Sequence, residues 1–340
     1  MPGFVLLILA CVVTAVLSWA AVGWVRQMLL CHAVLDRPNA RSSHATPLPR
    51  GGGLGLMVVV SLAWAAAAAW LGSAPPGFPP VMAGVAVLAV ISWLDDVRGS
   101  LPVAARLAAQ IMAVAVALLS FPDAGLVFQG ALPWLFDRLA TALLWLWFIN
   151  LFNFMDGIDG ITGVETAALG MGLALVAWLA GLAAPQVAMP ALLAAAALGF
   201  LAWNWAPARI FLGDVGSIPL GFVLGWLLLI TAAHGQWLAA AILPLYYLAD
   251  ATITLVRRLL RGEQVWRAHR AHFYQRAVAS GATHAAVAAK VLACNLALIG
   301  LAVAAALGFT WVALPGAVAA VALLLAHFAL GHRGDRRRNP

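Results

Sequence analysis

The stretch that decides the fold is residues 215–233, which read VGSIPLGFVLGWLLLITAA and contain no charged side chain. A helix needs about 20 residues to cross about 30 Å of hydrocarbon, so this run predicts a transmembrane helix that begins directly after Asp214. The same criterion, applied outward in both directions, gives eleven candidate spans: 3–24, 53–71, 80–94, 103–121, 133–151, 161–182, 186–204, 215–233, 236–256, 285–306 and 310–331.

The composition supports this assignment. Of the 340 residues, 64% are hydrophobic and 9% are charged, whereas about 25% of a soluble domain is charged. A water-soluble enzyme, a disordered chain and a disulfide scaffold are therefore excluded. We expect an all-α polytopic integral membrane protein that forms a single domain over residues 1–340. Residues 1–24 lack a basic start and are too long for a signal peptide, so we expect them to stay as the first helix.

The net charge of +7 indicates topology rather than nucleic-acid binding. If the N-terminus faces outward, every basic residue except Arg138 falls on the inner side, as the positive-inside rule requires. The three cysteines, Cys11, Cys31 and Cys294, match no metal or disulfide spacing. The predicted cytoplasmic segments are loops at about 26–52, 95–102, 150–160, 205–214 and 257–284, and a basic tail at 332–340.

Two groups of carboxylates lie at the predicted inner ends of spans. Asp95 and Asp96 end the third span, where adjacent charges are costly unless a cation neutralises them. Magnesium that bridges a phosphate would do so, and a capping pair answered by Arg98 is the alternative. Residues 150–160 read NLFNFMDGIDG, and helical spacing would place Asp156 and Asp159 on one side. A loop of Asx turns is the other interpretation of that segment.

Residues 204–217 lie between the seventh and eighth spans and include Asn204, Asp214 and Ser217. Asp214 and Ser217 stand at the start of a helix, where free N–H groups favour anions. An N-cap role for either residue is the ordinary alternative.

The longest predicted inner loop contains residues 266–276, WRAHRAHFYQR. His269 and His272 alternate there with arginines, which suits a clamp on a diphosphate or nucleotide. A solvated basic face against anionic lipid is the alternative. Nearby, Asp250 and Arg257 are expected to form a buried ion pair.

The first predicted inner loop contains residues 36–53, DRPNARSSHATPLPRGGG. Its glycines follow a basic residue and precede a helix, which would suit a phosphate cradle. No Walker motif is present, however, and close packing of helices also explains the glycines.

Together these segments resemble the polyprenyl-phosphate N-acetylhexosamine-1-phosphate transferases of glycosyltransferase family 4, and within them the branch that initiates O-antigen synthesis. The matching residues, in the family's order, are the D-x-P-N-x-R-x-x-H pattern from Asp36 to His44, Asp95-Asp96, Asn153-x-x-Asp156-Gly-x-Asp159-Gly and Phe211-Leu-Gly-Asp214-x-Gly-Ser217. The His-rich loop departs from the family, because it reads His-Arg-Ala-His where two or three closely packed histidines are common.

The resemblance implies transfer of an N-acetylhexosamine 1-phosphate from a UDP-sugar to undecaprenyl phosphate, with release of UMP. It implies Mg²⁺ as cofactor, with Mn²⁺ as an alternative, and an active site on the cytoplasmic face of a bacterial inner membrane. The product would start O-antigen or a related cell-envelope glycan. The expected sugar is GlcNAc, and a 6-deoxy N-acetylhexosamine is the alternative. The expected partners are the UDP-sugar, the lipid phosphate and the bilayer, without nucleic acid, and a homodimer is one possible assembly.

The resemblance also implies residue roles. Asp95, Asp96 and Asp214 would be catalytic, with Asp214 and Asn153 on the metal, and with Asp95 or Asp96 as a base toward the acceptor phosphate. The expected substrate-binding residues are Asn39, Arg41, His44, Asn153, Asp156, Asp159, Asn204, His269, Arg270 and His272. Asn153 is therefore expected to contact both the metal and the substrate.

Two other functions fit parts of the sequence. An intramembrane magnesium-dependent prenyltransferase would also use Asp-rich motifs, but it would release pyrophosphate rather than UMP. A lipid transporter or flippase would place ionisable residues on both sides and near the middle of the membrane. The one-sided placement of the acidic residues and the lack of an internal repeat argue against that class.

Overall fold

A computed structural model describes residues 2–32, 35–36, 47–98, 101–121, 126–264 and 269–335. It confirms an all-α membrane protein, because within these ranges nine helical stretches are long and apolar enough to cross a membrane. The elements are α1 (Pro2–Cys31), β1 (Leu35–Asp36), β2 (Leu48–Pro49), α2 (Gly53–Leu71), α3 (Phe78–Arg98), α4 (Val103–Leu119), α5 (Trp134–Phe154), α6 (Ile161–Leu179), α7 (Ala184–Asn204), α8 (Asp214–Thr231), η1 (Ala232–Gln236), α9 (Trp237–Ile242), α10 (Leu245–Leu260), α11 (Phe273–Ala279), α12 (His284–Ala306) and α13 (Thr310–Asp335).

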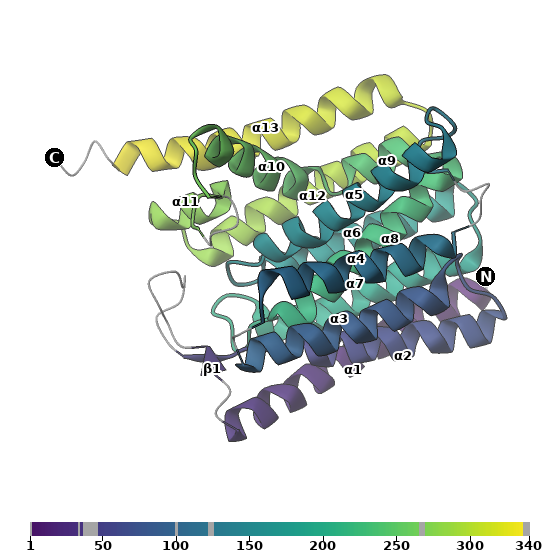
Figure 1. The fold of residues 1–340 in the computed structure, drawn as a ribbon, viewed down its shortest axis with the longest axis horizontal. Coiled ribbons are helices and arrows are strands. Elements are labelled where there is room, and N and C mark those ends of the chain that lie inside the picture. The colour runs from purple at the N-terminus through teal and green to yellow at the C-terminus, as the bar shows by residue number, and fades with distance from the viewer. Residues whose placement is uncertain are drawn as a thin grey trace.

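The long helices lie roughly side by side along the long axis of the molecule (Figure 1). The start of α1 lies at one end of this bundle, and β1, α11 and the end of α13 lie at the other. We call the second end the site end and the first the far end. The described parts of the segments predicted as inner loops lie at the site end, because consecutive helices run in alternating directions along the bundle.

The prediction of one continuous ninth span over 236–256 is wrong. After α8 the chain turns back at His234 and Gly235, and the returning crossing is broken into α9 and α10 at Leu243 and Pro244. Proline has no N–H to give to the helix and its ring collides with the preceding turn, so the helix stops there.

The helix α10 is polar on its buried side and apolar on its exposed side. Its buried residues include Tyr246, Asp250 and Thr254, while Val256 and Leu260 are exposed. This pattern is the reverse of a soluble amphipathic helix and suits a helix that meets lipid outside and polar groups inside. Elsewhere the spans were placed correctly to within several residues, although α3 is longer than predicted and α4 has only 17 residues.

The helix α8 forms the centre of the bundle, and every residue from Val215 to Thr231 is buried. The indole of Trp145 on α5 stacks on Phe222 of α8 with ring centroids 4.8 Å apart, and its Nε1 donates to the Phe222 carbonyl at 2.8 Å. Large rings with satisfied polar atoms therefore fix α5 against α8. In contrast to the fully buried α8, the helix α1 has a mostly exposed outer face, as expected for a helix that contacts lipid.

A short backbone ladder joins the segments that precede α2 and α8. The amides of Gly51 and Gly52 donate to the Phe211 carbonyl at 3.1 and 2.8 Å, and the amide of Gly53 donates to Leu212 at 2.9 Å. A Cβ on Gly53 would collide with the backbone of Gly216. The glycines of the first inner loop thus serve close packing, and this contact fixes the start of α8 against the start of α2.

We predict that Gly53→Ala destabilises the protein by about 1–3 kcal/mol, because the added methyl group must push two backbones apart. A thermal unfolding series in detergent would measure this loss. Gly300→Ala on α12 is the matched control, since its Cβ would meet nothing within 4 Å. A melting temperature of Gly53→Ala equal to that of the control would contradict the packing argument.

Candidate active site

Asp96 holds the start of α8. Its Oδ1 accepts from the amide of Asp214 at 3.2 Å and its Oδ2 accepts from the amide of Val215 at 2.9 Å. The side chain is only 3% exposed, and Arg50 Nε lies 3.1 Å from Oδ1. The first amides of a helix have no partner within the helix, so a carboxylate from α3 satisfies them and interacts favourably with the helix dipole. Both oxygens of Asp96 are thereby committed.

Two arginines connect the carboxylates. Arg50 Nη2 lies 2.7 Å from Asp214 Oδ1, and Arg106 Nη1 lies 2.7 Å from Asp95 Oδ2 and 3.4 Å from Asp214 Oδ2. Asp95 also accepts from the amide of Leu101 at 3.0 Å. Three acidic and two basic side chains from four segments thus form one cluster at the site end.

Neither arginine was among the predicted site residues. A signal for Arg50 was present, since it directly precedes the glycines at 51–53. Arg106 is the only basic residue of the predicted fourth span, which is the one feature that could have singled it out.

Asn153, at the end of α5, reaches the same cluster. Its Nδ2 donates to Ser217 Oγ at 2.7 Å and to Asp214 Oδ1 at 3.3 Å. Asp214 therefore has neighbours from α4, α5 and the segment before α2. The structure brings together the predicted residues Asp95, Asp96, Asn153 and Asp214, although the chain separates them by up to 119 positions.

Asp156 lies beside this cluster in the loop between α5 and α6. Its Oδ1 accepts from Thr162 Oγ1 at 2.7 Å. Burial raises the pKa of Asp156 to about 6, and the negative charges of Asp214 and Asp96 add to the rise, while the Thr162 hydrogen bond and Arg50 oppose it. A carboxylate in this setting is ionised more fully when a cation is near.

Asp159 does not face the same way as Asp156, contrary to the expected helical spacing. Its Oδ2 accepts from the amide of Ala208 at 3.0 Å, and its Oδ1 lies 3.2 Å from His284 Nδ1. The two acids have different partners because residues 155–160 form a turn, not a helix. At Gly157, a side chain would collide with the hydroxyl of Tyr274, so only glycine lets this turn pack against α11.

Asn204 joins two loops of the site. Its Oδ1 accepts from the amide of Gly160 at 3.0 Å, and its Nδ2 donates to the carbonyl of Ile210 at 3.0 Å. The side chain is buried. Asn204 therefore holds the loop at Gly160 and the loop at Ile210 together beside the site.

Asp250 fixes the His-rich segment. Its Oδ1 lies 3.2 Å from His272 Nδ1 and accepts from the amide of Phe273 at 3.0 Å, and its Oδ2 accepts from the amide of Tyr274 at 3.2 Å. The expected ion pair with Arg257 is wrong, because that guanidinium lies over the ring of Phe273 at 5.1 Å. Sequence reasoning missed the role of Asp250 since its partners lie more than 20 residues away.

His269 lies beside His272, with ring centroids 4.9 Å apart. Its Nδ1 accepts from the amide of Ala271 at 3.2 Å. Burial, together with the neighbouring His272 ring and the Arg258 guanidinium, lowers the pKa of His269 to about 4. The ring is neutral near pH 7, so its Nε2 carries the proton and can donate a hydrogen bond.

Four predicted substrate-binding residues remain to be placed. Arg270 is exposed at the site end. Asn39, Arg41 and His44 lie outside the residues that the structure describes.

The oxygen-rich cluster fits a magnesium ion chemically. Mg²⁺ takes oxygen ligands and is commonly held by one or two carboxylates together with water and substrate oxygens. Asp214 and Asn153 supply such ligands, and Asp156 lies near them. Over the described part of the chain, no three His, Cys, Asp or Glu side chains gather as a metal cage.

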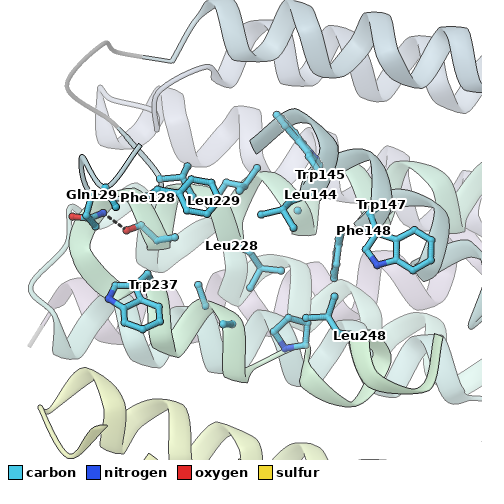
Figure 2. Close-up of a pocket in the computed structure, with 17 residues that line it drawn as sticks. Phe128, Gln129, Leu144, Trp145, Trp147, Phe148, Leu228, Leu229, Trp237 and Leu248 are labelled. Atoms are coloured by element: carbon cyan, nitrogen blue, oxygen red, sulfur yellow. Dashed lines mark hydrogen bonds between the residues drawn. The ribbon is translucent and has the colours of Figure 1, made fainter. Parts of the chain in front are cut away.

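An apolar cavity of about 520 Å³ lies between α5, α8 and α9. Figure 2 shows it extending from Gln129 and Trp237 to Phe148 and Leu248, with aromatic and aliphatic side chains along its walls. Trp237 lines the cavity and exposes about half of its surface (56%), so the cavity opens to the outside of the bundle. Phe148 lies five residues before Asn153 on the same helix, so the cavity ends close to the charged cluster.

The part of the sequence that contains the charged cluster is similar to known proteins. Residues 78–232, which run from α3 to the end of α8 and contain Asp95, Asp96, Asn153 and Asp214, match Glycosyl transferase family 4. This match confirms the resemblance inferred from the motifs, and the described helices are those of an integral membrane protein.

Particular relatives share most of their length with this chain. A decaprenyl-phosphate N-acetylglucosaminephosphotransferase of Mycolicibacterium smegmatis is 29% identical, over 79% of this chain and 75% of its own. A probable undecaprenyl-phosphate N-acetylglucosaminyl 1-phosphate transferase of Bacillus subtilis is 26% identical, over 76% and 74%. The undecaprenyl-phosphate alpha-N-acetylglucosaminyl 1-phosphate transferase of Escherichia coli K12 is 28% identical, over 79% and 76%.

We predict that Asp250→Asn loosens α11, because an amide replaces the charged acceptor of two backbone amides and presents an N–H group to them. Hydrogen bonds to charged groups contribute about 1.5–3 kcal/mol, so amide hydrogen exchange over 272–279 should accelerate by about tenfold or more. Asp137→Asn is the matched control, since Asp137 is equally buried but accepts from Val127 and Phe128 at the far end. Unchanged exchange in Asp250→Asn would contradict the capping role.

Proposed function

We propose that this chain transfers N-acetylglucosamine 1-phosphate from UDP-GlcNAc to a polyprenyl phosphate and releases UMP. The observation that carries the proposal is the cluster of Arg50, Asp96, Asp214 and Arg106 beside an apolar cavity. The cluster suits two phosphate-bearing substrates, and the cavity suits an isoprenoid chain.

The reaction joins two anions, so charge neutralisation and positioning would contribute most of the rate. An oxygen of the acceptor phosphate forms a bond to the phosphorus that carries the sugar, and the bond from that phosphorus to the bridging oxygen breaks. UMP leaves with that oxygen. Guanidinium groups bind phosphate through paired N–H donors, which suits Arg50 and Arg106 for holding the two substrates.

The acceptor itself needs little help to become nucleophilic. The second ionisation of a phosphate monoester has a pKa near 6, so most of it is dianionic at pH 7 or above. Asp96 is committed to the start of α8, which supports a positioning role for it rather than that of a base. Asp95 in turn holds Arg106.

Magnesium, with manganese as the alternative, is the proposed cofactor, held by Asp214 and Asn153. The ion would neutralise charge on the donor diphosphate. Asp156 and Asn204 are proposed to contact or frame the nucleotide, and Asp159 supports them through Ala208. His269, through its Nε2 proton, and Arg270 are proposed to hold the diphosphate or the sugar, while His272 is buried against Asp250.

The names of the relatives favour GlcNAc over a 6-deoxy sugar as the transferred group. The product would be a lipid-linked diphosphate sugar that starts O-antigen or a related cell-envelope glycan. The site end is proposed to face the cytoplasm of a bacterial inner membrane, because the basic residues of the described helices and loops gather there, apart from Arg138.

We predict that Asp214→Asn abolishes UMP release, because the change removes the charge shared by both arginines and the proposed metal. The assay uses detergent-purified protein, undecaprenyl phosphate, MgCl₂ and UDP-GlcNAc. Asp137→Asn, a buried far-end carboxylate, should keep most of the activity. Pyrophosphate release from a prenyl diphosphate, without UMP, would instead support a prenyltransferase, and near-normal turnover of Asp214→Asn would contradict the assignment.

Sidedness can be tested separately. The end of α13 lies at the site end (Figure 1), so a fluorescent protein fused after Pro340 should fluoresce, while alkaline phosphatase fused there should stay inactive. A truncation at Gly235, in the far-end turn, should give active phosphatase. The reverse pattern would place the site outside the cytoplasm.

A further inference from the structure

Trp203, on the last turn of α7, carries two guanidinium groups over its indole ring. The Cζ atoms of Arg26 and Arg209 lie 5.6 and 5.8 Å from the ring centroid. The ring itself is fixed, because it stacks on Trp19 with centroids 6.1 Å apart and its Nε1 donates to the Trp19 carbonyl at 2.8 Å. Two positive charges are thus held near one rigid aromatic surface.

Within the described ranges, neither Arg26 nor Arg209 forms an ion pair with a carboxylate, in contrast to Arg50, Arg106 and Arg258. Two like charges held over the same ring repel each other, and cation–π contact with that ring offsets only part of the cost. An anion that binds both guanidinium groups would stabilise the arrangement.

The surroundings of this cluster point to lipid. Trp19 and Trp24 on α1 expose 50% and 65% of their surface, and the outer face of α1 is apolar along its length. Tryptophan and arginine are typical of the zone where the hydrocarbon ends and phosphate groups begin. Arg209 is exposed, so an anion in that zone can reach it.

We propose that Arg26, Trp203 and Arg209 form a binding site for the phosphate of an anionic phospholipid of the bilayer, such as phosphatidylglycerol. Each guanidinium can give paired N–H donors to phosphate oxygens, and basic pockets between transmembrane helices on the cytoplasmic side are suited to such headgroups. The acyl chains would lie along the exposed face of α1.

The site is connected to the active site through backbone. Arg26 Nε donates to the Arg209 carbonyl at 3.2 Å, and the Arg209 amide donates to the Trp203 carbonyl at 2.8 Å. Phe211, two residues further on, pairs with Pro49 and Gly52, and Asp214 follows. A bound lipid would therefore steady the loop that leads to Asp214.

The test measures lipid binding without turnover. Native mass spectrometry of the full-length protein in detergent gives the apparent affinity for phosphatidylglycerol, with phosphatidylcholine as the neutral lipid. Arg209→Gln removes a charge but keeps the backbone carbonyl that Arg26 binds, so the fold should survive. We expect phosphatidylglycerol to bind roughly tenfold more weakly to this variant, with phosphatidylcholine unchanged.

Arg261→Gln is the matched control, since Arg261 is exposed at the same end of the bundle after α10. An equal loss in this variant would show diffuse electrostatic binding and overturn the site. Arg26→Gln should repeat the loss seen in Arg209→Gln, and full binding by both variants would also overturn it.

Competition identifies the source of the phosphate. Inorganic phosphate and undecaprenyl phosphate should each fail to displace phosphatidylglycerol at equal concentration. Displacement by inorganic phosphate would assign the cluster to a soluble anion, and displacement by undecaprenyl phosphate would assign it to the proposed substrate. Either result would overturn the proposal while leaving the proposed transfer reaction untouched.

Discussion

The carboxylate of Asp96 bound to the first amides of α8 is the contact on which the rest of the site depends. It fixes where α8 begins, and Asp214 is the first residue of that helix. Arg50 reaches both acids, and the ladder between 49–53 and 211–212 holds Arg50 in turn. A shift at any of these points would move the charged cluster as a whole, because no member of it is held by its own segment alone.

The same device occurs a second time at the site end. Asp250 on α10 binds the first amides of α11, as Asp96 on α3 binds those of α8. In both cases an acid from one helix completes the start of another, which satisfies amides that water cannot reach easily. The two caps place Asp214 and His272 at the starts of helices that are held by a side chain from another helix.

The sequence predicted the all-α class, nearly all crossings and the acidic members of the central cluster, because hydropathy and local motifs determine those features. It did not predict the break at Pro244 within an otherwise apolar run, nor the partners of Asp250 or the place of Arg106. The partners of Asp250 and the place of Arg106 depend on contacts between segments tens to more than a hundred residues apart. The prediction for Asp156 and Asp159 failed for the same reason. Helical spacing would have placed both side chains on one face, but packing against α11 and α7 makes this segment a turn, in which the two side chains have different partners.

The side opening of the cavity at Trp237 has a kinetic consequence. A lipid that enters there diffuses in two dimensions and never leaves the membrane, so its effective concentration is its mole fraction among the surrounding lipids. Diluting the protein and substrate in buffer would leave that quantity unchanged, whereas adding detergent or inert lipid would lower it. Occupancy of the cavity is therefore governed by the composition of the bilayer and not by the volume of the solution.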